Sequence, residues 1–232
     1  MSRNIKTSAI IAAAGSGTRM KSDVAKQFIE IGGMPVLART LSVFENASEI
    51  DEIIIATREC DIDGVWAIAK EYKTEKVTAV ICGGATRQET ISKALEAVSG
   101  ENVLIHDGAR PFIKAEQINA VAEALSESDA AALGIPVTDT IKTVKDGYIT
   151  GTIDRANLVS IQTPQGFRTD IIKKAHKRAA EMGVAVTDDC ALCEEMGIKI
   201  KVIQGSQTNI KLTTQGDLAI ADGIIAKERG AE

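Results

Sequence analysis

Short, uniformly apolar segments alternate along the chain with longer segments in which apolar residues recur every three or four positions. The first kind is typical of buried strands and the second of amphipathic helices. We therefore expect strands at Ser8–Ala13, Ile53–Thr57, Val77–Ile81, Val103–His106, Ala130–Val137 and Ile198–Ile203. We expect helices at Val36–Asn46, Ile62–Tyr72, Arg87–Val98, Glu116–Ser126, Thr169–Met182, Asp188–Met196 and from Gln215 to about Lys227, where Thr214 and Asp217 have the spacing of a capping box.

This order of elements predicts an α/β fold with a Rossmann-like, mostly parallel twisted sheet and helices on both of its faces. The chain has 232 residues, which fits one large domain, and we expect that domain to span residues 1–232. Ligands of open α/β sheets lie beyond the carboxyl ends of the strands. We therefore expect the functional residues at these strand ends.

One segment departs from the alternation of strands and helices. Between Asp139 and Ile153, Thr and charged residues alternate with Ile and Val around the pair Asp146-Gly147. This pattern predicts a β-hairpin, within a β-arm at about residues 138–160. A two-stranded ribbon is marginally stable alone, so we expect it to pack either on its own domain or on the same ribbon of a second subunit.

Composition and charge exclude several classes of protein. The formal net charge is −5, whereas a general nucleic-acid-binding surface is normally basic, so we expect no nucleic-acid partner. No run of about 18 apolar residues occurs, so no membrane-spanning helix is expected. The first apolar stretch continues into a glycine loop, unlike a signal peptide, and we expect a cytoplasmic protein.

The four cysteines do not form a disulfide framework or a zinc site. Cys60 and Cys82 stand alone, while Cys190 and Cys193 lie in a segment with helical character. A zinc site needs further ligands at comparable spacing, and none is present. We expect reduced thiols on a helix.

A glycine loop follows the first predicted strand. Gly15-Ser16-Gly17 ends the apolar run and is followed by Arg19, with Lys26 shortly after. Such a loop allows backbone N–H groups to approach a polyphosphate, and the two cations supply fixed positive charge. The alternative is a plain structural turn. A dinucleotide fingerprint would need glycine at Met20 and an acidic residue near Thr57, so a dehydrogenase is disfavoured, and no Walker motif is present.

Three more polar segments lie at predicted strand ends or before the last helix. His106 to Pro111 offers Asp107 for Mg²⁺ or a hydroxyl and Arg110 for a phosphate, although an Asp–Arg pair also serves to hold a loop. We interpret His106 as a structural residue rather than a base. Gly83-Gly84 permits close approach to a flat ring or makes a tight turn. In Asn209 to Thr213, Lys211 is either a ligand or a solvated surface lysine.

Together these segments resemble the 2-C-methyl-D-erythritol 4-phosphate cytidylyltransferase family of isoprenoid-precursor synthesis. The corresponding motifs, in family order from about residue 8 to about residue 225, are AAAGSGTRM (12–20), AKQF (25–28), GGATRQET (83–90), HDGARPF (106–112), DTIK (139–142), TIDR (152–155), QTPQGF (162–167), TDD (187–189) and NIKLT (209–213). The resemblance implies a nucleotidyltransferase-like fold of the glycosyltransferase-A kind. It implies that the acceptor's phosphate attacks the α-phosphorus of CTP and that pyrophosphate leaves.

The resemblance also implies roles for individual residues. Arg19, Lys26 and Lys211 would be catalytic through their charge. CTP would be bound by Ala13, Ala14, Gly15, Ser16, Gly17, Thr18, Gly84, Ala85, Thr90 and Asp107. Asp107 would also hold Mg²⁺ or another hard divalent cation. From the polar residues of the loop from Gly15 to Asp23, rather than from the resemblance, we expect movement of this loop to enforce the order of substrate binding.

The acceptor pocket implied by the resemblance includes a second subunit. The hairpin resembles an arm exchanged across a homodimer, so that Thr140 and Arg155 would reach 2-C-methyl-D-erythritol 4-phosphate in the partner's site. Arg110 and Thr187 would complete that pocket. Thr187 also has the position of a helix N-cap.

Three positions depart from the family, and two alternatives remain. The family commonly has Pro at Ala12, often an acidic residue at Ala85, and usually Ser at Thr90. A D-ribitol-5-phosphate cytidylyltransferase shares several motifs, but HDGARPF, QTPQGF and TDDC favour methylerythritol phosphate as acceptor. A catalytically inactive nucleotide-binding regulatory protein is disfavoured because Arg19, Lys26, Asp107 and Lys211 are all present.

Overall fold

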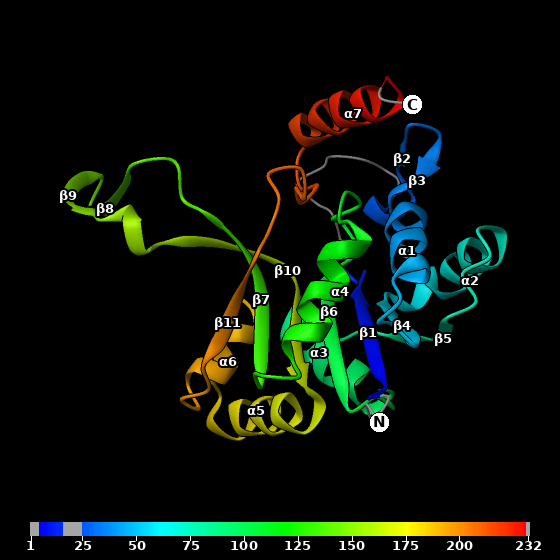
Figure 1. The fold of residues 1–232 in the computed structure, drawn as a ribbon, viewed down its shortest axis with the longest axis horizontal. Coiled ribbons are helices and arrows are strands. Elements are labelled where there is room, and N and C mark those ends of the chain that lie inside the picture. The colour runs from blue at the N-terminus through cyan, green and yellow to red at the C-terminus, as the bar shows by residue number, and fades with distance from the viewer. Residues whose placement is uncertain (1–4, 16–24, 231–232) are drawn as a thin grey trace.

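A seven-stranded sheet forms the centre of the molecule in the computed structural model, which describes residues 5–15 and 25–230. The strand order is β11-β7-β10-β6-β1-β4-β5 (Figure 1). The strands are β1 (Thr7–Ala12), β4 (Glu52–Thr57), β5 (Val77–Cys82), β6 (Asn102–Asp107), β7 (Ala130–Pro136), β10 (Val159–Arg168) and β11 (Ile200–Gln204). The six strands expected from the apolar pattern are confirmed, with ends that differ by at most about two residues.

The sheet is mostly parallel, as predicted, with one exception. β1 runs parallel to β4 and β6, and β4–β5 and β11–β7 are also parallel pairs. β10 was not predicted as a strand, and it lies antiparallel between β6 and β7. It contains Pro164, which cannot donate a ladder hydrogen bond, and the register with β7 shifts between Ile161 and Gln165. Because this segment contains a proline and several polar residues, its pattern did not predict a central strand.

Helices cover both faces of the sheet. On one face lie α1 (Val36–Asn46), α2 (Ile62–Glu71) and α4 (Ala115–Ala124), and on the other lie α3 (Arg87–Glu96), α5 (Thr169–Met182) and α6 (Asp189–Glu194). Because strand side chains alternate between faces, Ile11 packs in the first cluster and its neighbour Ile10 in the second. Both are fully buried, as expected for strands covered on two sides.

The last helix, α7 (Gln215–Arg229), packs outside these layers. It covers a small hairpin of β2 (Glu30–Ile31) and β3 (Met34–Pro35), with Ile225 against Gly32. The predicted capping box is confirmed, because Thr214 and Asp217 bond reciprocally at the helix start. This helix therefore fixes the chain segment that precedes it.

The predicted hairpin is confirmed as an arm that projects from the sheet (Figure 1). β8 (Ile141–Lys145) pairs with β9 (Tyr148–Ile153), and in the described residues these strands form a sheet separate from the central one. Asp146 and Gly147 have φ of 51° and 84°, the left-handed pair that a tight two-residue hairpin turn requires. Short one-turn helices lie at Lys26–Phe28, Glu59–Asp61 and Arg155–Asn157.

Several smaller expectations have clear outcomes. Cys190 and Cys193 are buried free thiols on α6, as predicted, and burial raises the pKa of Cys193 to about 12. The N-cap prediction for Thr187 is wrong, because Asp188 accepts the hydrogen bond of the Ala191 N–H.

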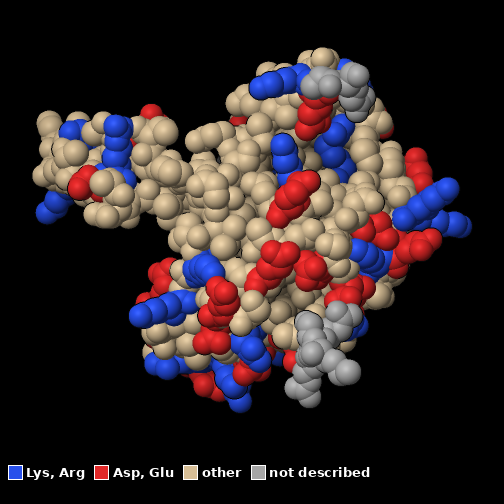
Figure 2. All heavy atoms as spheres, in the orientation of Figure 1, with Lys and Arg blue, Asp and Glu red and all other residues tan. Residues whose placement is uncertain are grey.

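No helix in the described part of the chain is long and apolar enough to cross a membrane. On the face shown in Figure 2, acidic and basic side chains are interspersed and no broad basic area is visible.

Candidate active site

A cleft of about 440 Å³ lies at the carboxyl ends of β1, β5 and β6. Nine of the predicted site residues line it: Ala13, Ala14, Gly15, Lys26, Gly84, Ala85, Thr90, Asp107 and Lys211. Ser16, Gly17, Thr18 and Arg19, and most of the loop expected to move, lie outside the described residues. The structure thus brings together segments separated by up to two hundred positions in the sequence, at the edge where α/β sheets bind ligands.

Backbone hydrogen bonds fix the floor of the cleft at the end of β1. The Ala13 N–H donates to the Ala56 carbonyl at 2.7 Å, and the Gly108 N–H donates to the Ala12 carbonyl at 3.0 Å. A Cβ at Gly108 would lie 3.3 Å from that carbonyl and 3.1 Å from Ile11 Cγ2, closer than such contacts usually are. The glycine after Asp107 therefore allows the ends of β1 and β6 to approach each other.

The β5–α3 turn forms the opposite wall. A Cβ at Gly83 would lie 2.8 Å from the Ala14 Cβ, so glycine is required for the two walls to come this close. The Gly84 N–H donates to Thr90 Oγ1 at 3.0 Å, and that hydroxyl donates to the Thr86 carbonyl at 2.8 Å. The double glycine is thus both a tight turn and a flat wall, held by Thr90 from within α3.

Asp107 carries the main negative charge of the described cleft. Lys211 Nζ lies 2.7 Å from its Oδ2, Arg87 Nε lies 3.6 Å from its Oδ1, and Arg110 Nε lies 3.7 Å from its Oδ2. Burial acts to raise the pKa of the Asp107 carboxyl, but these cations outweigh burial and hold its pKa well below the usual range. Asp107 is therefore ionised at neutral pH.

Lys211 is placed by the loop that precedes it. The buried Asn209 donates through Nδ2 to the Thr163 carbonyl at 3.0 Å, and Arg110 donates to the Asn209 carbonyl at 2.7 Å. The Leu212 N–H donates to the Ala109 carbonyl at 2.9 Å. Lys211, between these anchors, is directed into the cleft with 39% of its side chain exposed, unlike a solvated surface lysine.

Lys26 enters the cleft from the start of the one-turn helix Lys26–Phe28. Its neighbour Gln27 is buried and donates to Asp61 at 2.8 Å, and Arg58 bonds the same carboxylate at 2.6 Å. This anchor on the adjacent residue fixes the backbone that carries Lys26. Two lysines from distant parts of the sequence therefore line the cleft that also contains the ionised Asp107.

His106 is a structural residue, as predicted. It is fully buried, with Nδ1 at 3.1 Å from Thr163 Oγ1 and Nε2 at 3.2 Å from the Arg110 carbonyl. Burial lowers its pKa to about 4, so it is neutral at neutral pH. With both ring nitrogens engaged, it orders the loop after β6.

Four predicted acceptor residues do not line the cleft of a single chain. Arg110 lies behind Asp107 with 13% of its side chain exposed. Thr187 is exposed in the connection before α6, and Thr140 and Arg155 are exposed on the arm, where Arg155 bonds the Thr138 carbonyl. The described part of one chain thus gathers the expected nucleotide residues but not the expected acceptor residues.

The structure adds lining residues that the sequence interpretation did not single out. They are Ala12, Gln27, Thr86, Arg87, Gly108, Ala109 and Thr213. Arg87 stands inside the quoted GGATRQET motif, and a cation in the first turn of a helix opposes the helix dipole. That unfavourable placement was the available signal for a functional arginine.

A family model for 2-C-methyl-D-erythritol 4-phosphate cytidylyltransferase matches residues 7–227. The chain belongs to this family. Relatives carrying that name include those of Halalkalibacterium halodurans, 42% identical over 96% of this chain and 98% of the relative, and Bacillus licheniformis, 43% identical over 96% and 97%. The match extends across all the motifs that carried the resemblance.

Solved structures agree with this membership. The 4-diphosphocytidyl-2C-methyl-D-erythritol synthase of Anaerococcus prevotii superposes with a TM-score of 0.87 at 35% identity, covering 96% of this chain and 97% of that one. The Thermus thermophilus 2-C-methyl-D-erythritol 4-phosphate cytidylyltransferase gives 0.77 at 29% identity, covering 94% and 98%. The predicted fold class is thus confirmed both by the sheet and by these structures.

Proposed function

We propose that the protein transfers the cytidylyl group of CTP to 2-C-methyl-D-erythritol 4-phosphate, giving 4-diphosphocytidyl-2-C-methyl-D-erythritol and pyrophosphate in non-mevalonate isoprenoid-precursor synthesis. One observation carries the proposal: Lys26, Asp107 and Lys211 converge on a single cleft at the carboxyl edge of the sheet. They do so in a chain that belongs, over residues 7–227, to the family with this activity.

The narrow part of the cleft suits the cytosine ring. Ala13 and Ala14 form one wall and Gly84 with Ala85 the other. These walls approach closely because Gly83, which precedes Gly84, has no Cβ to meet the Ala14 Cβ. Thr90 and Glu89 accept the Gly84 and Ala85 N–H groups, so the other backbone groups of these fixed walls select a pyrimidine by shape and by hydrogen bonding. Backbone contacts of this kind are compatible with the departure at Ala85, where the family often has an acid.

The charged part of the cleft suits the phosphates. The acceptor's phosphate oxygen forms the new bond to the α-phosphorus while the bond to the pyrophosphate oxygen breaks. The protein has to align these groups and stabilise the charge that develops on the phosphoryl oxygens. Lys26 and Lys211 supply cations at the cleft, and the proposed role of Arg19 adds a third. Lys211 exchanges its contact with Asp107 for a phosphate oxygen when CTP binds.

The cleft also fits a divalent cation. Mg²⁺ is normally held by one or two carboxylates together with substrate phosphates and water, and Asp107 offers one ionised carboxylate at the cleft. When bound, Mg²⁺ would neutralise phosphate charge and polarise the α-phosphoryl group. Lys211 holds the same carboxylate in the free chain, so the arriving cation would displace a lysine rather than meet a bare acid.

The arm supports a homodimer in which each site takes residues from both chains. Its exposed apolar side chains include Val144, Tyr148 and Ile149, which are 63%, 78% and 68% exposed, an arrangement typical of a surface covered by a partner. Thr140 and Arg155, distant from the cleft of their own chain, would bind the acceptor in the other subunit. Arg110 and Thr187 would complete the pocket beside Asp107.

The proposed activity is tested by identifying the product. The protein is incubated with Mg²⁺, methylerythritol phosphate and either CTP, UTP or ATP, and products are analysed by mass spectrometry and ³¹P NMR. We expect a diphosphodiester from CTP, and rates at least about 100-fold lower from ATP, because a purine is too large for the narrow wall. Formation of no diphosphodiester with CTP would remove the proposal.

A further inference from the structure

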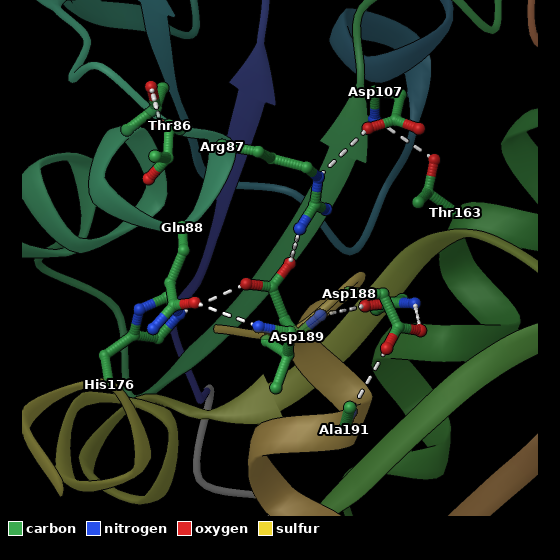
Figure 3. A network of polar contacts seen from close by, with 12 residues as sticks. Thr86, Arg87, Gln88, Asp107, Thr163, His176, Asp188, Asp189 and Ala191 are labelled. Atoms are coloured by element: carbon green, nitrogen blue, oxygen red, sulfur yellow. Dashed lines mark hydrogen bonds and ion pairs between the residues drawn. The ribbon is translucent and has the colours of Figure 1, made fainter. Parts of the chain in front are cut away.

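Four charged or titratable side chains form a line of contacts that begins at Asp107 in the cleft (Figure 3). His176 Nε2 on α5 is 3.1 Å from Asp189 Oδ1 on α6, and Asp189 Oδ2 is 2.7 Å from Arg87 Nη1 at the start of α3. The Nε of the same guanidinium is 3.6 Å from Asp107 Oδ1. These contacts thus connect α5 and α6, which cover one face of the sheet, to the Asp107 carboxylate in the cleft.

Asp189 is the buried member of this line. Its side chain is 1% exposed, and a carboxylate removed from water requires a cation and hydrogen bonds. Arg87 supplies the cation, while His176 supplies the contact on the other oxygen. Because both oxygens are engaged by different elements, the position of Asp189 is fixed from two sides.

Arg87 is held at its two ends by different carboxylates. Its Nη1 contacts Asp189 and its Nε contacts Asp107, and 29% of the side chain remains exposed at the cleft. A cation in the first turn of α3 opposes the helix dipole, so the two carboxylates, rather than the helix, favour this position. Planar guanidinium groups suit this bridging geometry, whereas an ammonium offers a single point of charge.

We infer that Asp189 is a positioning residue for the nucleotide site: it holds Arg87, and Arg87 holds the Asp107 carboxylate in the orientation that receives CTP. This inference rests on the proposed CTP site. Arg87 meets Oδ1 of Asp107 while Lys211 meets Oδ2, so Arg87 keeps one carboxylate oxygen directed to its side when Lys211 leaves for a phosphate. Without Asp189 the guanidinium keeps its contact with Asp107 but loses its anchor at the other end, so the two groups turn together.

A purely architectural role for Asp189 has different consequences. The backbone N–H of Asp189 donates to Gln165 at 3.2 Å, and Gln165 donates to Asp188 at 2.8 Å. These bonds hold the start of α6 and do not use the Asp189 carboxylate. The substitution Asp189→Asn therefore leaves them in place, and it keeps the shape of the side chain while removing its charge.

The experiment measures the CTP dissociation constant by calorimetry, with Mg²⁺ present, for wild type, Arg87→Gln, Asp189→Asn and the double variant. Each single substitution is expected to raise the constant about tenfold, the effect of losing one buried contact between charged groups. The double variant is expected to match Arg87→Gln within about twofold, because Asp189 acts through Arg87. In steady-state kinetics the KM for CTP rises while the KM for the acceptor does not.

A second ion pair in the chain provides matched controls. Arg39 and Glu228 lie 3.7 Å apart, with Arg39 22% exposed, and neither residue lines the cleft. Arg39→Gln and Glu228→Gln change the net charge as the test substitutions do. We expect them to leave the CTP dissociation constant within about twofold of wild type. If Asp189→Asn does not fold, Asp189→Glu replaces it, because it keeps the charge but displaces the carboxylate by one methylene.

The outcomes separate the inference from the proposed function. If the wild-type protein binds no CTP, the proposed nucleotide site itself is wrong. Wild type that binds CTP, with Arg87→Gln or Asp189→Asn binding equally well, would overturn the inference alone. Additive losses in the double variant would also overturn it, since independent effects indicate an architectural Asp189. A non-additive cycle with unchanged controls would support it.

Discussion

At the scale of single residues, buried carboxylates in this chain accept hydrogen bonds from groups held by other elements. Glu52, at the start of β4, contacts Lys6 Nζ at 3.0 Å and accepts hydrogen bonds from the Ser99 N–H at 2.8 Å and the Ser8 hydroxyl. It joins β1, β4 and the turn before β6 at the amino edge of the sheet, opposite the cleft. Its role is thus stability rather than chemistry.

Glu52 predicts how stability depends on pH. Burial acts to raise its pKa, but the bonds from Ser8, Ser99 and Lys6 outweigh burial and lower the pKa from 4.5 to about 2. A carboxyl whose pKa is lowered by folding stabilises the fold above its unfolded pKa, and this contribution disappears as the pH falls toward the folded pKa. The window for Glu52 therefore lies between about pH 4.5 and 2.

We expect Glu52→Gln to lower the free energy of unfolding at pH 7 by roughly 2–3 kcal/mol. The difference from wild type is expected to narrow as the pH falls from 4.5 to 3, measured by urea unfolding at each pH. Glu71→Gln, at an exposed position on α2, is the control and should stay within about 0.5 kcal/mol throughout. A difference that does not change with pH would contradict the assignment to charge.

The sequence predicted the residues that line the cleft better than the buried residues that hold them in place. Lys26, Asp107 and Lys211 stand in recognisable motifs at strand or loop ends, and the structure brings them together. Asp189 sits in a run of acidic residues that reads as a solvated helix start, and only the fold shows its burial against Arg87. The sequence gives no sign of partners contributed by distant elements. Asp188, rather than Thr187, is the N-cap because its own side chain accepts the Ala191 N–H.

At the scale of elements, the start of α7 links stability to the cleft. Asp217 Oδ2 accepts the Thr213 N–H and the Thr214 N–H, each at 2.7 Å. Thr213 lines the cleft, two positions after Lys211. The helix cap therefore orders the segment that carries a proposed catalytic lysine.

Asp217→Ala is expected to lower the free energy of unfolding by about 1–2 kcal/mol, the usual cost of a lost cap. It should also raise the KM for CTP, because the segment of Lys211 and Thr213 loses its anchor. Asp222→Ala, an exposed aspartate on the same helix, serves as control and should change neither. Thermal or urea unfolding measures the change in stability, and steady-state kinetics measures the change in KM. An unchanged free energy of unfolding in Asp217→Ala would contradict the role of the cap.

Strands with a uniformly apolar centre could be predicted from the sequence, whereas β10, which mixes polar and apolar residues, could not. β1, β4 and β6 read as buried strands because every residue of their centres is apolar. β10 contains Gln162, Thr163, Pro164 and Gln165, yet it lies between β6 and β7 because those polar side chains find partners such as Asn209 and Asp188. Burial of a polar strand depends on long-range hydrogen bonds, which no local pattern shows.

At the scale of the whole molecule, the proposed dimer predicts complementation between two inactive variants. In Lys26→Ala the chain's own cleft is impaired, whereas in Arg155→Ala only the arm offered to the partner is impaired. A heterodimer of the two contains one site with both Lys26 and Arg155. Random mixing at equal amounts makes half of the dimers mixed, so about a quarter of wild-type activity is expected to return.

The mixing experiment uses variants co-refolded or co-expressed at equal amounts, with each homodimer measured alone. Arg39→Gln mixed with Lys26→Ala is the control for mixing itself, and here about half of the wild-type activity is expected, because sites carrying Lys26 keep an intact partner arm. No recovery of activity in the Lys26→Ala and Arg155→Ala mixture would contradict a shared site. With Arg155→Ala inactive alone, that result would indicate that Arg155 acts on the site of its own chain.

The central claim is tested most directly by the choice of acceptor. Initial rates of pyrophosphate release from CTP and Mg²⁺ are measured with 2-C-methyl-D-erythritol 4-phosphate and with D-ribitol 5-phosphate. We predict a kcat/KM at least about 100-fold higher for methylerythritol phosphate, because its site would be built to bond that acceptor's own hydroxyls. Equal or faster release with ribitol 5-phosphate would contradict the account of the acceptor site while leaving the nucleotide cleft in place.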